Sequence, residues 1–443
     1  MALFNQILQF ILSISFLVIL HELGHFIPAK LFKTKVEKFY LFFDPWFSLV
    51  KKKIGETEYG IGWLPFGGYV KIAGMVDESM DTEQLKKPAE PWEFRAKPAW
   101  QRLIIMLGGV IVNFFLAWII YGCLSFFNGE TYHDNAKFQD GIYASEAAQK
   151  MGLRTGDYII SIDGKPTERM ENTMINLLLA NEATVLRDGK EVTIPINEDG
   201  VAEVLKADEA RMYFSPRFEV IVDSIMPKSL AQEAGLQKGD KIVGVNQKSI
   251  KYFDELSSIL DAHKGKSVEL KVLRQGSPIN LSTTVGKDGK LGFLFSSKEI
   301  ANAINHTEVT KHYTLLQAIP RGFERTIDAL VMQVKQFKII FNQKTQGYKK
   351  VSGPIGIVKM MPTSINWEAF WSFTAMFSIW LAFLNLLPIP GLDGGHVMFT
   401  LWEMITGKPV PQKVLENAQM IGVIFLMGLM LLIIGGDIFK LFK

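Results

Sequence analysis

Residues 2–27 read ALFNQILQFILSISFLVILHELGHFI, an apolar run that ends in a His-Glu-Leu-Gly-His motif. The first 19 of these residues carry no charge, and the run is long enough for a helix to cross the hydrocarbon core of a membrane. On a helix, His21 and His25 lie on one face, so both imidazoles can reach one metal ion. Glu22 can then take a proton from water that the metal activates. The stretch therefore predicts a metal site at the end of a membrane-spanning helix.

Both histidines have a plainer interpretation, because a histidine on an apolar helix is usually a core residue satisfied by a hydrogen bond. Two histidines and a glutamate in this one pattern are uncommon by chance, and ionisable groups at the edge of a membrane span are costly. We therefore expect His21 and His25 to bind Zn²⁺ and Glu22 to act as the catalytic base.

The composition agrees with a membrane protein. Apolar residues make up 48% of the 443 residues, with 32 Phe and 18 Met. A formal net charge of +3 gives no global basic character, so we expect no nucleic-acid partner. The single cysteine, Cys123, lies in an apolar run, which excludes a disulfide framework and a thiolate metal site.

Four apolar runs predict a mostly α-helical, polytopic membrane protein. The expected spans are 1–27, 102–127, 369–390 and 418–437. We expect Pro28 to end or bend the first helix. The charge-free part of the fourth run has only 17 residues, from Met420 to Gly436, so this span would barely cross the bilayer. Asn113, a buried amide in the second span, is expected to hydrogen-bond to another helix.

Lysines gather after the first span. Seven of them lie between Lys30 and Lys53, against only Glu37 and Asp44, and such an excess of cations beside a span marks the cytoplasmic side. The loops on the cytoplasmic side are then 28–101 and 391–417. The region between the second and third spans lies outside the cytoplasm.

Residues 55–75 combine aromatic and β-branched residues with Pro65 and the pair Gly67-Gly68. This pattern predicts a β-hairpin whose arms lie on either side of the proline and the glycines. The hairpin is too apolar for a free loop, so we expect it to enter the membrane beside the metal site, where protein or water satisfies its backbone. An ordinary soluble hairpin is the alternative.

An internal repeat lies between the second and third spans. GLRTGDYIISIDG at residues 152–164 matches GLQKGDKIVGVN at residues 235–246. A G-L-x-x-G-D turn followed by an alternating strand resembles the PDZ fold, so we expect PDZ-like domains at 128–215 and 216–300. They either bind peptide ends by adding a strand to a sheet edge or exclude bulky substrates. Residues 301–368 include apolar residues at helical spacing, which predicts an amphipathic segment on a membrane surface or against neighbouring protein.

The third zinc ligand is expected after the third span, because a catalytic zinc usually has three protein ligands and one open position. The first and third spans run in the same direction, since one span lies between them, so their C-terminal ends meet the same face. Asp393 is the only carboxylate next to the end of the third span, where Pro388 and Pro390 break the helix. We expect Asp393 to be the third ligand, and His396, one turn further on, competes for this role.

Three motifs together resemble the site-2 protease family of intramembrane zinc metalloproteases, and the resemblance covers essentially the whole chain. They are H-E-x-x-H in the first span, G-x-x-x-N ending at Asn113 in the second, and N-x-x-P-x-P-x-L-D-G beginning at Asn385. The resemblance implies that His21, His25 and Asp393 are the zinc ligands and that Glu22 is the catalytic base, as the residue patterns above also predict.

The resemblance also implies a substrate, the transmembrane segment of a single-span membrane protein, whose peptide bonds are hydrolysed within the bilayer. Regulated intramembrane proteolysis of anti-sigma factors or signal-peptide remnants is the expected setting. In this family, residues near the LDG motif and a re-entrant β-loop hold the substrate. The implied substrate-binding residues are Asn385, Pro390, Gly67, Gly68 and Tyr69.

The tandem PDZ-like pair favours the bacterial members of the family. We therefore expect an inner-membrane protein with the PDZ-like domains in the periplasm and the active site toward the cytoplasm. Other functions stay open. A non-enzymatic PDZ membrane scaffold would not need Glu22, a membrane-anchored protease would cut soluble substrates, and a metal transporter would need ligands near mid-membrane. The expected gathering of Asp393 and the histidines at one side favours the intramembrane protease.

Overall fold

The computed structural model describes the chain except for residues 76–87, 139, 207–212, 297–300, 303 and 442–443. The chain forms two compact units. The first comprises Met1–Gly129, His312–Phe337 and Lys349–Lys443, and the second comprises Glu130–Lys311 and Lys338–Tyr348. Each unit is described by itself.

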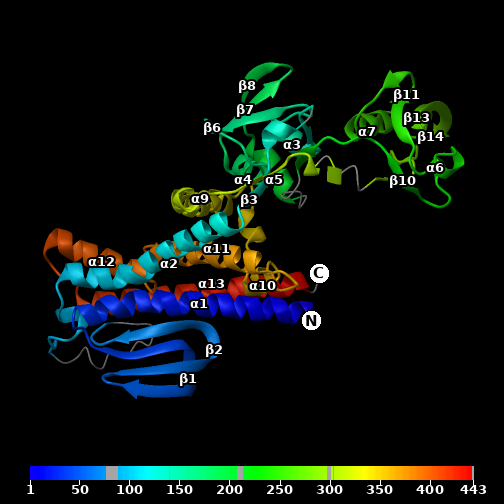
Figure 1. Cartoon of the computed structure of the whole chain (residues 1–443). Helices are drawn as coiled ribbons and strands as arrows, with labels where there is room; N and C mark the ends of the chain where they lie inside the picture. Colours follow the sequence, from blue (N-terminus) through cyan, green and yellow to red (C-terminus); the bar gives the residue numbers. More distant parts are fainter. Residues whose placement is uncertain (76–87, 139, 207–212, 297–300, 303, 442–443) are drawn as a thin grey trace. The chain divides into compact units, whose positions relative to one another are not determined.

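The first unit is built on four long apolar helices (Figure 1). They are α1 (Ala2–Leu31), α2 (Ala99–Phe127), α11 (Trp367–Leu386) and α13 (Gln412–Leu441). Within the described residues, these four are long and apolar enough to cross a membrane. The predicted polytopic, mostly helical membrane protein is therefore confirmed. Shorter helices of this unit are η2 (Phe94–Ala96), α10 (Pro354–Val358) and α12 (Asp393–Thr406).

Small and hydroxylated residues fix α1 against its neighbours. A Cβ atom on Gly24 of α1 would collide with the Gly108 carbonyl oxygen of α2, so the two backbones touch there. The Ser13 hydroxyl lies 2.8 Å from the Thr374 hydroxyl of α11. Ser378 of α11 donates to the Asn113 carbonyl of α2 at 2.8 Å. The three helices are thus held together by one backbone contact and two hydrogen bonds of hydroxyl groups.

Two helix ends lie beyond the expected ones. Of the two expectations for Pro28, an end of the helix is wrong, because α1 continues for three residues to Leu31; a proline removes one N–H donor but allows the next turn to form. The fourth helix is longer than its 17-residue charge-free core. The polar residues from Gln412 onward begin α13, which therefore has 30 residues.

The predicted hairpin exists, but with different limits. Strands β1 (Val36–Ile54) and β2 (Thr57–Ile72) pair around a turn that contains Gly55, whose φ is +62°. The expected turn at residues 65–68 is wrong, because this stretch lies inside β2. Pro65 fits there since no residue between Leu64 and Gly68 pairs with β1, so its missing N–H costs no ladder bond.

The hairpin folds back on itself into a small curved sheet. Tyr40 of β1 pairs with Tyr69 on one side and with Gly60 on the other, so the start of β1 lies between the two halves of β2. The end of β1 pairs with the first half of β2. The second half of β2 therefore forms an edge of the sheet, and it lies against α1 (Figure 1).

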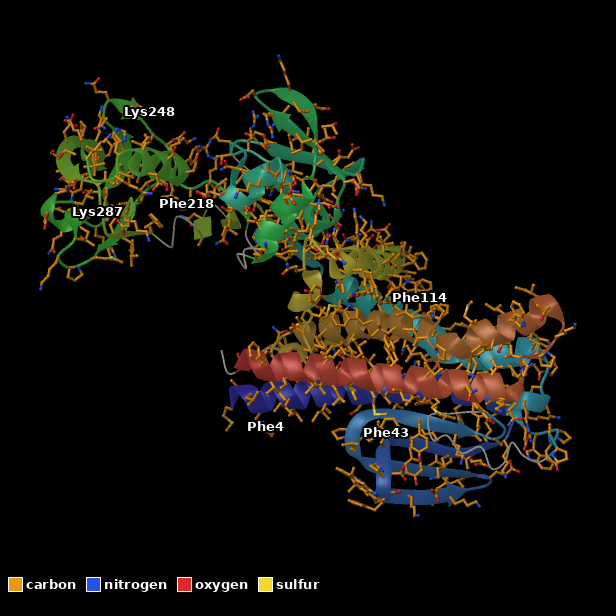
Figure 2. The ribbon with its side chains drawn as sticks, turned by 180° about the vertical axis from the view of Figure 1, so that it is seen from behind. Phe4, Phe43, Phe114, Phe218, Lys248 and Lys287 are labelled. Carbon is orange, nitrogen blue, oxygen red and sulfur yellow. The ribbon has the colours of Figure 1, made fainter. Side chains whose placement is uncertain are left out.

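Helix α9 (Leu315–Phe341) has the expected amphipathic pattern. Within the first unit, it packs on α2: a Cβ atom on Gly322 would lie 2.6 Å from the Gly122 nitrogen. Phe114 of α2, labelled in Figure 2, lies edge-on to Phe323 with ring centroids 6.0 Å apart. Other apolar side chains of α9 are exposed, including Leu316. One face therefore contacts neighbouring protein, and another remains available to a membrane surface.

The second unit contains two repeats with the same sheet order, β6-β5-β7-β8 and β12-β11-β13-β14. The first has β5 (Tyr158–Ile162), β6 (Lys165–Pro166), α4 (Met170–Leu179), β7 (Glu182–Arg187) and β8 (Lys190–Pro195). The second has β11 (Lys241–Val245), β12 (Lys248–Ser249), α7 (Phe253–Ala262), β13 (Ser267–Arg274) and β14 (Ser277–Thr284). Each repeat has a hydrophobic core of its own. The sequence repeat is therefore a repeat of structure.

The remaining elements of this unit are short. Short helices among its described residues are η3 (Asn135–Lys137), α3 (Glu146–Lys150), α5 (Glu198–Lys206) and α6 (Leu230–Glu233), and η4 (Gly347–Lys350) begins at its end. Three strand pairs complete it: β3 (Glu130–His133) with β16 (Glu308–Lys311), β4 (Ile142–Ala144) with β9 (Phe214–Pro216), and β10 (Val222–Ile225) with β15 (Phe293–Phe295).

The G-L-x-x-G-D turns show why the motif recurs. Asp157 of the first repeat is buried and accepts two hydrogen bonds from Arg187 at 2.8 Å. Asp240 of the second repeat is buried and accepts the same two bonds from Arg274. Burial raises the pKa of Asp240, but the bonds from Arg274 and from the Gln237 backbone outweigh it and hold that pKa below its ordinary value. Each motif aspartate therefore anchors its turn to a strand.

Candidate metal centre

Three side chains from distant parts of the first unit meet beside α1. His21 and His25 of α1 are buried, and Asp393 begins α12. Among the residues that the structure describes, these three form the one group of His, Cys, Asp and Glu suited to a metal ion, with ligand atoms within 4.8 Å of one another. Span counting predicted this meeting, although 368 residues separate His25 from Asp393.

The distances match those of a tetrahedral zinc site. The two Nε2 atoms of His21 and His25 lie 3.3 Å apart, and Asp393 Oδ2 lies 3.4 and 3.3 Å from them. With metal–ligand distances of about 2.1 Å, tetrahedral ligand atoms lie about 3.4 Å apart. The buried Oδ2 atom accepts no hydrogen bond of good geometry from the described residues. Two imidazoles and one carboxylate therefore fit Zn²⁺ without movement of a side chain.

The ring of His25 is oriented for this role. Its Nδ1 atom lies 2.8 Å from the Ile105 carbonyl oxygen of α2, so Nδ1–H donates and Nε2 keeps its lone pair. This hydrogen bond fixes both the ring plane and the tautomer.

The ring of His21 is oriented by Asn113 of α2. The Asn113 amide group lies 3.0 Å from Nδ1 of His21. A histidine that binds metal through Nε2 keeps its proton on Nδ1 and needs an acceptor there. Asn113 Oδ1 is buried without a hydrogen-bond partner among the described residues, and it meets this need when the amide is turned by 180°. The predicted interhelical amide thus also supports a candidate ligand.

Gly109 has a role that the sequence did not suggest. A Cβ atom on Gly109 would lie 2.5 Å from His21 Cε1 and 2.5 Å from His25 Nε2. Gly108, one residue earlier, accounts for the close approach of α1 and α2. Gly109 instead leaves the space in which the candidate ligand atoms meet. Its position at the start of the G-x-x-x-N motif is the sequence feature from which this role could have been predicted.

Asn385 faces the metal position, whereas His396 does not belong to the metal group. Asn385, near the end of α11, has its amide nitrogen 3.2 Å from His21 Nε2, so it faces the metal position. His396 lies one turn into α12 and is not part of the three-residue group. Asp393 is therefore the better third ligand of the two candidates.

The second half of β2 reaches the site through its backbone. A Cβ atom on Gly68 would lie 2.6 Å from Val18 Cγ1 and 3.7 Å from Glu22 Cγ. The Val70 backbone lies near the Glu22 carboxyl group. Gly67 has a φ of +95°, which favours glycine at this bend. An edge of the sheet therefore runs beside the candidate base.

The side chain of Tyr69 packs against residues of β1. Its hydroxyl donates to Asp44 at 2.8 Å, and its ring stacks on Tyr40. Burial and the bond to Asp44 raise the pKa of Tyr69, so the hydroxyl stays protonated at neutral pH. Pro390 lies in the segment that precedes Asp393, and its carbonyl oxygen faces Gly422 of α13.

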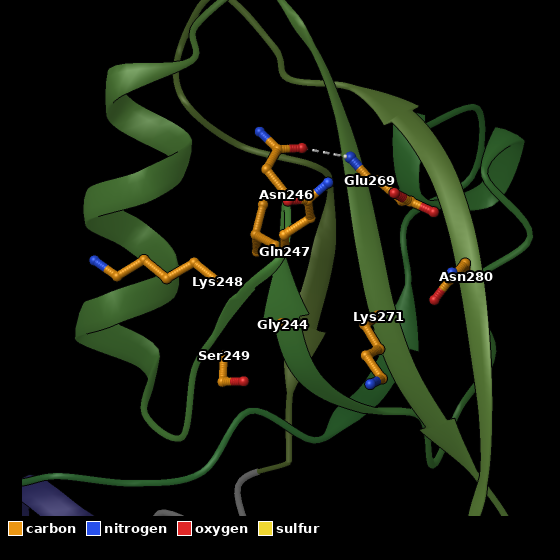
Figure 3. A pocket seen from close by; sticks show the side chains of 9 residues that line it. Gly244, Asn246, Gln247, Lys248, Ser249, Glu269, Lys271 and Asn280 are labelled. Atoms are coloured by element: carbon orange, nitrogen blue, oxygen red, sulfur yellow. Dashed lines mark hydrogen bonds between the residues drawn. The ribbon is translucent and has the colours of Figure 1, made fainter.

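A polar hollow in the second unit is distinct from the metal centre. It has a volume of about 240 Å³ and lies on the sheet of the second repeat (Figure 3). Its lining includes Asn246, Glu269, Lys271 and Asn280. None of the predicted site residues lines it, so it has no part in the metal centre.

Comparison with known proteins agrees with this geometry. The model of peptidase family M50 matches residues 9–429. The chain belongs to peptidase family M50. It is 28% identical over 455 residues to the regulator of sigma E protease of Haemophilus influenzae, with 98% of each chain covered. It is 28% identical over 457 residues to the regulator of sigma-E protease RseP of Escherichia coli, again with 98% of each covered. A putative zinc metalloprotease of Clostridium perfringens is 30% identical over 431 residues, 97% of each chain.

The family membership confirms the predicted class of enzyme. The M50 peptidase is a zinc metalloprotease of the site-2 type, which hydrolyses peptide bonds within transmembrane segments of membrane proteins. Zn²⁺ is its cofactor. The assignment of individual ligands, the PDZ identity of the repeats and the membrane contact of the hairpin stay predictions.

Proposed function

We propose that His21, His25 and Asp393 hold the zinc ion and that Glu22 is the catalytic base of an intramembrane protease. One observation carries this assignment: three metal-binding atoms lie 3.3–3.4 Å apart at the end of a membrane-length helix. The next residue after the first histidine is the glutamate that a hydrolase needs.

Each residue has a task in peptide hydrolysis. When bound, Zn²⁺ polarises the scissile carbonyl group and lowers the pKa of water toward 7. Glu22 takes the proton of the attacking water and passes it to the leaving amine. Ile105 and Asn113 hold the two imidazole rings in place. Gly109 leaves room for the reacting groups.

The substrate must unwind before it is cut, because a helical peptide bond is shielded by its own turn. The freed N–H and C=O groups then need partners inside the membrane. The edge of β2 at Gly67, Gly68 and Tyr69 supplies them by accepting a new strand; among the described strands, only β1 pairs with this half of β2. The Asn385 amide group donates a hydrogen bond to the substrate strand beside the metal position, and Pro390 borders this substrate strand.

The proposed setting is the inner membrane of a bacterium. The lysines after α1 support a cytoplasmic position for the active site, which makes the path for water short. The two repeats then lie in the periplasm as PDZ-like domains, where they bind peptide ends or exclude substrates that have not been trimmed. Relatives named regulators of sigma E protease support anti-sigma factors as substrates.

Replacement of Glu22 by Gln tests the proposal. Glu22→Gln removes the proton acceptor but no zinc ligand, so cleavage of a single-span reporter in reconstituted membranes should fall by about 10²- to 10⁴-fold. The zinc content should not change. Glu56→Gln, at the exposed hairpin turn, is the matched control and should cleave normally. Undiminished cleavage by Glu22→Gln would remove the assigned mechanism.

A further inference from the structure

Helix α13 touches the rest of the first unit at very few residues. Between residues 412 and 439, where its side chains are described, only Gln419, Gly422 and Asp437 are buried. Gln419 is 4% exposed and Asp437 is 5% exposed. Polar side chains inside a membrane-length helix are costly and call for a function. Asp437 accepts hydrogen bonds from the backbone N–H groups at the start of α10, which leaves Gln419 and Gly422 to be explained.

Gln419 binds the segment that carries Asp393. Its Oε1 atom accepts a hydrogen bond from the Gly391 backbone N–H at 3.1 Å. Gly391 lies two residues before Asp393 and has a φ of +100°, a conformation that strains other residues. The amide of Gln419 therefore satisfies a buried backbone donor in a turn that leads directly to the candidate ligand.

Gly422 brings the backbone of α13 onto the same turn. A Cβ atom on Gly422 would collide with the Pro390 carbonyl oxygen. From the other side, a Cβ atom on Gly391 would lie 3.3 Å from the Val423 nitrogen. The helix and the turn are thus in backbone contact one helical turn after Gln419.

Apolar packing does not replace these two contacts. A hollow of about 410 Å³ lies where Pro388, Ile389 and Pro390 face α13. Ala418, Ile421 and Phe425 line its other wall. Because side chains leave this space open, the hydrogen bond of Gln419 and the close approach at Gly422 are the contacts that hold the turn from the side of α13, in addition to the backbone hydrogen bonds within residues 387–395.

We propose that Gln419 and Gly422 are positioning residues that hold Asp393 at the distance needed to bind zinc. The inference rests on the proposed role of Asp393 as a ligand. A metal site requires its ligands within about 0.5 Å of the productive geometry, so a shift of the turn weakens the third ligand. Neither residue belongs to the three-residue metal group, and both act through the backbone of residues 390–391.

Zinc release from the full-length purified protein tests the inference. Gln419→Leu and Gly422→Ala should each release zinc to a chelator about 10- to 100-fold faster, the effect of losing an outer-shell partner. Gln419→Glu keeps an acceptor oxygen and should release zinc at nearly the wild-type rate. Two matched controls on α13 should also match the wild type: Gln412→Leu at its exposed start, and Gly428→Ala, where nothing lies within 4 Å of an added Cβ.

Two further readouts separate positioning from simple loss of structure. The Co²⁺-substituted Gln419→Leu protein should show altered absorption bands, and its kcat should fall while KM is unchanged. Thermal unfolding identifies a variant that does not fold. The Gln419→Glu variant then tests the role of the acceptor oxygen. If this variant folds but releases zinc as fast as Gln419→Leu does, the inference is contradicted. Wild-type release from both Gln419→Leu and Gly422→Ala also overturns it.

Asp393→Ala distinguishes failure of this inference from failure of the proposed function. If Asp393→Ala releases zinc rapidly and Gln419→Leu does not, Asp393 is a ligand but α13 does not position it. If Asp393→Ala itself keeps zinc as the wild type does, the ligand assignment is wrong and the positioning role is lost with it.

Discussion

Helices α1 and α13 have the same length but are held in opposite ways. The buried residues of α1 recur every three to four positions from Gln9 to Ala29, and glycine and serine bring α2 and α11 onto its backbone. Between residues 412 and 439, α13 buries only three residues. The two proposed ligands on α1 are thus supported along a whole helix, whereas α13 contacts the turn before the proposed third ligand, Asp393, at only a few residues.

The largest effect is expected where α1 and α2 touch. Gly24→Val places branched carbon atoms against the Gly108 backbone, which cannot move aside as a side chain can. Overpacking of this kind costs about 3 kcal/mol. Thermal unfolding in detergent should show the loss, and Gly428→Val on α13 should unfold as the wild type does. Equal unfolding of the two variants would contradict the contrast between the helices.

A smaller effect is expected at Asn113, which contacts His21, one of the two proposed ligands on α1. Asn113→Leu removes the acceptor for His21 Nδ1–H, so zinc affinity should fall by about 10-fold. Asn113→Asp keeps an acceptor oxygen and should retain zinc more tightly than Asn113→Leu. Competition with a chelator measures both. If the two variants lose zinc equally, Asn113 matters only for helix packing.

The smallest effect is expected at Ser13, far along α1 from the ligands. Ser13→Ala removes the hydrogen bond to Thr374, and interhelical bonds of this kind contribute about 0.6 kcal/mol in membrane proteins. Unfolding should shift slightly and zinc content should stay the same, since neighbouring contacts hold the helix. Ser15→Ala is the control, because the Ser15 hydroxyl bonds within its own helix, to Ile11. A loss of zinc from Ser13→Ala would show that α1 is less firmly held than its contacts indicate.

Predictions from local patterns were correct where the residues that interact are close together in the sequence. The four membrane-length helices follow from runs of apolar residues, and the repeat of G-L-x-x-G-D turns follows from the turn and strand that each copy encodes. The hairpin was located but its turn was misplaced. Pro65 and the glycines were interpreted as a turn, whereas all three lie inside β2, where Pro65 and Gly67 are unpaired and Gly68 pairs with Leu41 of β1.

The sequence by itself determined the motif on α1, the number of apolar helices and the pairing of His21 and His25 on one face, because helical periodicity and hydropathy are properties of neighbouring residues. It also predicted that Asp393 returns to the same side, and the structure brings that residue to both histidines. Only the tertiary structure decided the roles of Gly109, Gln419 and Gly422. Each of these depends on where the backbone or side chains of another element lie, and no local pattern encodes that position.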